Sequence, residues 1–148
     1  MSNNVVSIAK PPRLAIVLLG SLAMFQVVRI LAYSIIQDVL AGTTPEAWLF
    51  PAGMDVFVGV MAIFVAIGLW RGKGLFVWTA AIVFFVLSIS DHADAITVVL
   101  NTRGPLPAMM SGPTAATVTM LVVTSLVEAF AIWALTTERL RAHYLTAR

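Results

Sequence analysis

The chain has 148 residues, of which 60% are apolar and 11% are charged, whereas soluble domains are about half apolar and a quarter charged. Its formal net charge of +2 rests on few ionisable groups, so the composition gives no support to nucleic-acid binding. It has no cysteine, which excludes disulfides, thiolate nucleophiles and iron–sulfur ligation by cysteine. We therefore expect a single transmembrane domain over residues 1–148.

Four apolar runs follow one another along the chain. Each is long enough to cross a hydrocarbon core of about 30 Å as an α-helix, and none has the two-residue polar alternation of a membrane β-strand. The second run reaches this length only when residues 51–54 are included. We predict an all-α membrane protein, a four-transmembrane-helix bundle with spans over residues 14–36, 52–70, 75–100 and 114–135.

The positive charges predict the orientation of these spans. Cytoplasmic segments of membrane proteins are enriched in Lys and Arg, and outside the spans only Arg103 falls on the side away from the termini. We therefore predict cytoplasmic N and C termini in a multi-pass protein of the bacterial inner membrane. Its expected partners are the lipid bilayer and either further copies of itself or other membrane subunits. The charges on the predicted cytoplasmic side are Lys10, Arg13, Arg71, Lys73, Arg139, Arg141 and Arg148.

Ionisable side chains within the spans mark a candidate site, because each costs about 2.5–3.5 kcal/mol at a helix centre. At 1.5 Å per residue, Arg29 lies about 22 Å from the cytoplasmic end of the first span. Asp55, Asp91 and Asp94 are expected near the same level. Because an unpaired Arg would be the costliest member, we expect Arg29 between Asp91 and Asp94, with Asp55 closing the ring. The result would be an acidic site that faces the outside.

Three further residues belong to this candidate site. Gln26 and Tyr33 share a helical face with Arg29, and His92 points about 100° away from Asp91 on the third span. Two interpretations remain open for the whole set. It binds a cation, a proton or a small polar ligand, or it is a polar network that fixes the register of the helices.

The fourth span carries a separate candidate, Glu128, which we place nearer the cytoplasm than the other charges. Thr117, Thr124 and Glu128 trace one helical face, and in one interpretation this hydroxyl-lined stripe is a proton relay inward from the outer site. In the alternative interpretation, the hydroxyls bond to carbonyls of their own helix. Glu128 then snorkels or pairs across an oligomer interface.

The sequence carries no haem or metal signature, so no cofactor can be assigned. Asp91 and His92 are adjacent and do not readily chelate one ion, and the second histidine, His143, follows the fourth span in the cytoplasmic tail. Ser88 and Ser90 lie near His92, but no nucleophile elbow surrounds them. An enzyme that uses His92 and Asp91 as acid and base is therefore only the third functional alternative.

We expect first a ligand-binding or accessory subunit of a membrane complex, organised around the outward-facing polar site. The second alternative is a proton- or cation-coupled transporter or channel, in which Asp91 or Asp94 titrates and Glu128 relays.

Short motifs occur between Trp48 and Asp94, over about a third of the chain. They are residues 51–53 leading into 55–59, a hairpin rich in Arg, Lys and Gly, Trp78, and Asp91 with Ala95. This stretch resembles a loosely defined group of uncharacterised bacterial four-helix inner-membrane proteins. The usual Asn of that group after the hairpin Trp is Thr79 here. The resemblance implies no activity; it implies only that Asp55 and Asp91 are worth treating as a pair.

Overall fold

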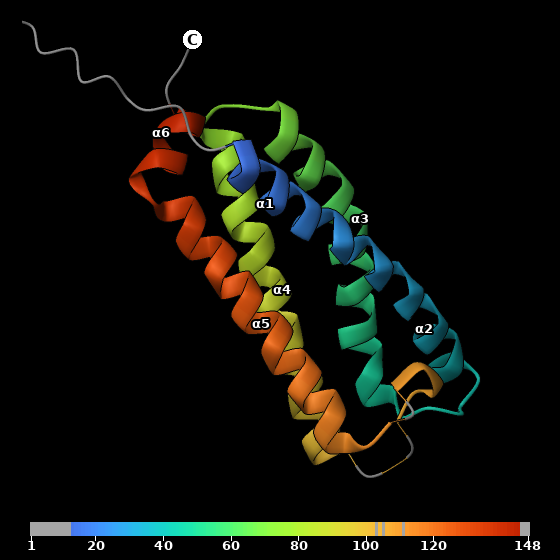
Figure 1. The fold of residues 1–148 in the computed structure, drawn as a ribbon. Helices are drawn as coiled ribbons and strands as arrows, with labels where there is room; N and C mark the ends of the chain where they lie inside the picture. The colour runs from blue at the N-terminus through green and yellow to red at the C-terminus, as the bar shows by residue number, and fades with distance from the viewer. Residues whose placement is uncertain (1–12, 103, 105, 111, 146–148) are drawn as a thin grey trace, which may run out of the picture.

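The chain is described by a computed structural model over residues 13–102, 104, 106–110 and 112–145. Lys10, Arg103 and Arg148 of the predicted charge pattern lie outside these ranges. The described residues contain helices and no strand. In chain order the helices are α1 (Arg13–Phe25), η1 (Gln26–Ala32), α2 (Tyr33–Leu40), η2 (Glu46–Trp48), α3 (Leu49–Arg71), α4 (Leu75–Asn101), η3 (Ala108–Met110), α5 (Thr114–Thr136) and α6 (Glu138–Leu145) (Figure 1).

Four helical segments are long and apolar enough to cross a membrane: Arg13–Leu40, Glu46–Arg71, Leu75–Asn101 and Thr114–Thr136. The prediction of an all-α chain with four such helices is therefore confirmed. The second segment includes Pro51, which lies in the first turn of α3. Proline is tolerated there because the first backbone N–H groups of a helix have no partner within the helix.

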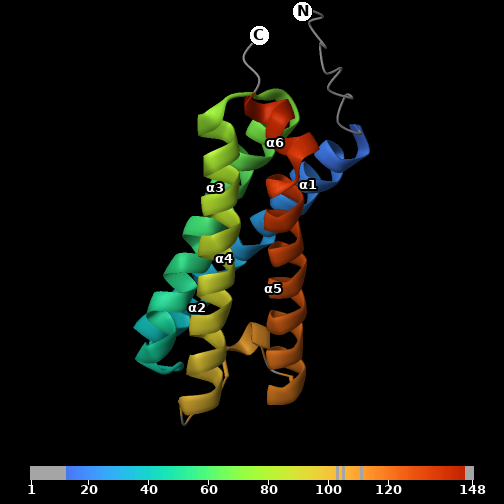
Figure 2. The same cartoon turned by 90° about the vertical axis from the view of Figure 1, so that its left-hand side faces the viewer.

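The helices form an elongated bundle (Figures 1 and 2). α3 packs against α1, η1 and α4, and α4 packs in turn against α5. The start of α1, the α3–α4 hairpin and α6 all lie at one end, which we call the hairpin end. The α2–α3 connection and η3 lie at the opposite end, which we call the loop end.

α6 is a feature that the sequence analysis missed, because it treated the residues after the fourth span as a tail. Leu140 and Tyr144 are buried against the bundle. The Tyr144 hydroxyl donates to the carbonyl oxygen of Leu69 at 2.9 Å, and the backbone N–H of Gly74 donates to the carbonyl oxygen of Tyr144 at 2.6 Å. Burial raises the pKa of Tyr144 to about 12. These contacts fix α6 against the hairpin.

The interior consists of two apolar clusters, one toward the hairpin end and one toward the loop end. In each spanning segment, polar residues separate the part that enters the first cluster from the part that enters the second. The residues of this polar layer are Gln26, Arg29, Asp55, Ser88, Asp91, His92 and Glu128. All are buried except Asp55, which is partly buried.

A charged network in the polar layer

The backbone of η1 brings two polar side chains to one side of the first spanning segment. This stretch is a 3₁₀ helix, in which residues three apart lie directly above one another. Gln26, Arg29 and Ala32 are accordingly its buried residues. η1 approaches α3 closely at Gly59, where an added Cβ would lie 2.8 Å from the backbone nitrogen of Ile30. The 3₁₀ turn and this glycine together set Gln26 and Arg29 against α3 and α4.

Arg29 joins two other helices through its guanidinium. Nε donates to Oδ1 of Asp55 on α3 at 2.5 Å. Nη2 donates to Oδ2 of Asp91, and Nη1 donates to Oγ of Ser88, both on α4. The structure thus brings Arg29, Asp55 and Asp91 together, as the sequence analysis expected. Their role as a ligand site stays a prediction.

Glu128 belongs to the same network, and its predicted separation from the other charges is wrong. Its Oε1 accepts hydrogen bonds from Nε2 of Gln26 at 2.9 Å and from Oγ of Ser88 at 2.6 Å. The side chain is fully buried, so it neither snorkels nor reaches the outer surface of the bundle. Side chains on a helix lean toward its N-terminus. For α5 this direction is toward the loop end, so the carboxylate approaches the level of Ser88.

His92 faces α5 rather than Asp91. Its Nδ1 lies 3.2 Å from Oγ of Ser125 and 3.4 Å from Oε2 of Glu128. The Ser125 hydroxyl also donates to the carbonyl oxygen of Leu121 at 2.9 Å. No hydrogen bond joins His92 to Asp91 among the described residues, and their role as an acid–base pair stays a prediction.

Asp94 and Tyr33 do not enter the network, contrary to expectation. An α-helix turns by about 100° per residue, so Asp91 lies about 60° to one side of Ser88, and Asp94 lies about 120° away from Ser88. The buried stripe continues through Ala95 instead, and Asp94 is exposed. Tyr33 is 56% exposed, because the 3₁₀ turn places Ala32 rather than the following residue on the side of Arg29.

The predicted threonine relay is not continuous in the described structure. Thr117 is buried, whereas the Thr124 hydroxyl donates to the carbonyl oxygen of Met120 at 2.9 Å. No hydrogen-bonded row of hydroxyls links these residues to Glu128 in the described ranges. Of the two interpretations, bonding back to the parent helix holds for Thr124.

A cavity of about 280 Å³ touches the network. Its polar lining residues are Gln26, Arg29, Asp55, Asp91, His92 and Thr124, and its other lining residues are apolar. Met110 of η3 also lines it, which places the cavity toward the loop end. The cavity is thus an amphipathic space, lined by two carboxylates and by mostly apolar side chains.

The network holds more carboxylates than fixed cations. Asp55, Asp91 and Glu128 together carry three negative charges when ionised, against the single positive charge of Arg29. Two buried oxygens, Oδ1 of Asp91 and Oε2 of Glu128, have no hydrogen bond among the described residues. No group of three candidate metal-binding side chains occurs there either. The arrangement favours uptake of positive charge, as a proton or as a cationic group.

Sequence reasoning noted Ser88 near His92 without assigning it to the site, and it overlooked Ser125. Ser88 lies three residues before Asp91 on the same helical face, so the spacing was available as a signal. Ser125 had no such signal, because its contact with His92 depends on how α4 and α5 rotate against each other.

No family model, curated protein or solved structure matches the chain. The resemblance to uncharacterised bacterial membrane proteins therefore stays a prediction, although Asp55 and Asp91 do contact the same guanidinium.

Proposed function

We propose that the chain is a multi-pass protein of the bacterial inner membrane, with cytoplasmic termini, that binds a small lipophilic ammonium ion in the cavity beside Arg29. The observation that carries this proposal is the excess of carboxylates over cations at a cavity with mostly apolar walls. An ammonium group supplies the missing positive charge and donates to Asp91, while an apolar body contacts the hydrocarbon wall. The volume suits a small ligand.

Thermal unfolding in detergent with benzylammonium or benzyl alcohol tests this proposal. A ligand that binds only the folded state raises the unfolding temperature with its concentration. We expect stabilisation by benzylammonium and little by the uncharged alcohol, which controls for partitioning into the micelle. Asp91→Asn removes a charge-assisted hydrogen bond and should weaken the response roughly tenfold or more.

Asp94→Asn is the matched control, because it makes the same chemical change one turn away on the exposed face of α4. It should leave the benzylammonium response unchanged. Equal responses in Asp91→Asn and wild type, or equal stabilisation by the alcohol, would overturn the proposal and favour a network that only fixes helix register.

The exposed face of α4 supports the predicted association with a second membrane subunit. It carries a polar seam, defined as Ser90, Asp94, Thr97 and Asn101, at helical spacing within a candidate membrane span. A carboxylate exposed to lipid is costly, so a contact at Asp94 would stabilise an assembly. The particle mass of the same two variants tests this: Asp94→Asn should shift it downward and Asp91→Asn should not.

Proton- or cation-coupled transport is a second candidate function. Hydrogen bonds connect the cavity wall at Arg29 to Glu128 through Ser88, and Glu128 lies beside His92. Titratable side chains therefore extend from the cavity toward the hairpin end. A transport assay in liposomes separates this candidate from simple ligand binding.

A further inference from the structure

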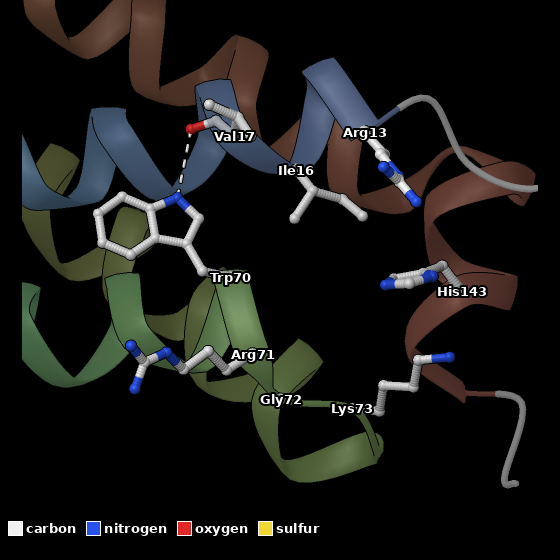
Figure 3. Close-up of a pocket in the computed structure, with 8 residues that line it drawn as sticks. All are labelled: Arg13, Ile16, Val17, Trp70, Arg71, Gly72, Lys73 and His143. Carbon is white, nitrogen blue, oxygen red and sulfur yellow. Dashed lines mark hydrogen bonds between the residues drawn. The ribbon is translucent and has the colours of Figure 1, made fainter.

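A second pocket, of about 600 Å³, opens at the hairpin end (Figure 3). It is built from the start of α1, the end of α3, the α3–α4 hairpin and the docked helix α6. It shares no residue with the charged network. Its lining residues are Arg13, Ile16, Val17, Trp70, Arg71, Gly72, Lys73 and His143.

All the ionisable side chains that line this pocket are basic. Arg13, Arg71 and Lys73 line it together with His143, and no carboxylate does. None of the three cations forms an ion pair with a described residue. Figure 3 shows the side chains of Arg13, Lys73 and His143 gathered on one side. Burial and the neighbouring Lys73 lower the pKa of His143. The pocket thus concentrates positive charge that the described protein does not neutralise.

Its other wall is apolar. Ile16 of α1 and the indole of Trp70 line it, and the carbonyl oxygen of Val17 faces the indole (Figure 3). The indole N–H donates to the carbonyl oxygen of Val17 at 3.4 Å. The ring lies on Gly20, where an added Cβ would be 2.0 Å from Nε1, and it is 40% exposed. Trp70 is therefore held in place while part of its ring remains accessible.

The position of the pocket limits which ligands can reach it. Arg13 is the first residue of one candidate membrane span, and Arg71 is the last residue of the next. In a bilayer, the ends of spanning helices lie at the headgroup level, where tryptophan is also enriched. The pocket would thus open to the layer that contains lipid phosphates.

We propose that this pocket binds the headgroup of an anionic phospholipid, with Arg13 and Lys73 on the phosphate and with Trp70 and Ile16 against the glycerol and upper acyl chain. Arg and Lys are the usual partners of phosphate, and basic pockets between spanning helices bind anionic headgroups. The apolar wall favours a lipid over free phosphate, which would leave that wall uncovered. This inference rests on the proposed residence in a membrane.

The test compares two double variants that remove the same charge from the same end. Arg13→Gln/Lys73→Gln alters the pocket, and Arg139→Gln/Arg141→Gln removes two exposed arginines of α6 that do not line it. Each purified protein is titrated in detergent with dioleoyl phosphatidylglycerol, dioleoyl phosphatidylcholine or inorganic phosphate. The rise in unfolding temperature gives the apparent affinity.

Phosphatidylglycerol should stabilise wild type more than phosphatidylcholine does, and inorganic phosphate should have little effect. Each cation near an anionic headgroup contributes about fivefold in affinity, so the pocket variant should bind roughly thirtyfold more weakly. The α6 variant should resemble wild type. Equal losses in both variants would show nonspecific attraction and overturn the proposal, as would equal effects of the two lipids. Stabilisation by phosphate alone would indicate an anion site instead.

Resistance of the membrane-bound protein to carbonate extraction separates this inference from the proposed function. If the chain is extracted, membrane residence fails and both proposals fall. If it is retained and binds benzylammonium but does not distinguish the two lipids, only the headgroup site fails.

Discussion

Arg29 holds the charged network together, because one guanidinium donates to side chains of both α3 and α4. Its contacts with Asp55 and Asp91 are enclosed by the bundle. Removal of one partner from a buried ion pair typically costs about 3–5 kcal/mol, because the remaining charge keeps its desolvation penalty. Two carboxylates would lose their cation here at once.

Arg29→Met should therefore lower the free energy of unfolding by about 3–5 kcal/mol, as measured by SDS titration in mixed micelles. The matched control is Arg71→Met, since Arg71 is exposed and forms no ion pair with a described residue. The free energy of unfolding of that variant should stay within about 0.5 kcal/mol of the wild-type value. Equal free energies of unfolding for the two variants would show that the network contributes little to stability.

Helix length and direction alone predict that Arg29, Asp55 and Asp91 lie at the same depth along the bundle. The predicted position of Asp94 is wrong because three residues of an α-helix turn about 60° less than a full turn. Asp91 already lies at the edge of the buried stripe of α4, so a further step of three residues places Asp94 on the exposed face. The predicted depth of Glu128 is wrong because it is the depth of the Cα atom. The side chain leans toward the N-terminus of α5, so its carboxylate lies nearer the level of Ser88.

At the scale of elements, the contact between η1 and α3 sets the geometry of the site. A 3₁₀ stretch in the middle of a helix marks a strained segment or a hinge. η1 lies close to α3 because Gly59 has no side chain: an added Cβ would lie 2.8 Å from both Cγ1 and the backbone nitrogen of Ile30. The position of Arg29, which precedes Ile30, depends on this approach.

Gly59→Ala and Gly53→Ala should change stability in opposite directions, although both place alanine within α3. An added methyl at Gly59 pushes η1 away and should cost about 1–3 kcal/mol. Gly53 has nothing within 4 Å of an added Cβ, so alanine should stabilise the helix by up to about 1 kcal/mol. SDS unfolding of both variants measures the difference. A stabilising Gly59→Ala would show that η1 adjusts freely.

The sequence predicts the four long helices well, because their apolar runs and charged ends are continuous local signals. It does not predict η1 or α6. Nothing local distinguishes Gln26–Ala32 from an α-helix, and its 3₁₀ form accompanies the tertiary contact at Gly59. α6 has low intrinsic hydrophobicity, and it is held by Tyr144 against residues 69 and 74, far away in the chain.

At the scale of the whole molecule, the polar layer lies between two apolar clusters. The cavity reaches the layer from the loop end, whereas Phe84 and Phe85 belong to the buried cluster on the hairpin side. The buried phenylalanines therefore separate the cavity from the hairpin end. An ion could cross only if the helices moved. η1 is a 3₁₀ segment in the interior of a candidate span, whereas η2 lies at the start of one.

Transport through this layer requires titratable groups on both sides of Ser88, so Asp91 and Glu128 must both be needed. In liposomes containing a pH-sensitive dye, wild type should dissipate an imposed proton gradient, and Asp91→Asn and Glu128→Gln should each reduce the rate to that of empty liposomes. Asp94→Asn should retain it, because its side chain lies outside the network. If wild type is inert under proton, sodium and potassium gradients, transport of these ions is excluded. If Asp91→Asn abolishes the flux and Glu128→Gln does not, Glu128 is not a relay, and the ion crosses by a route that does not include it.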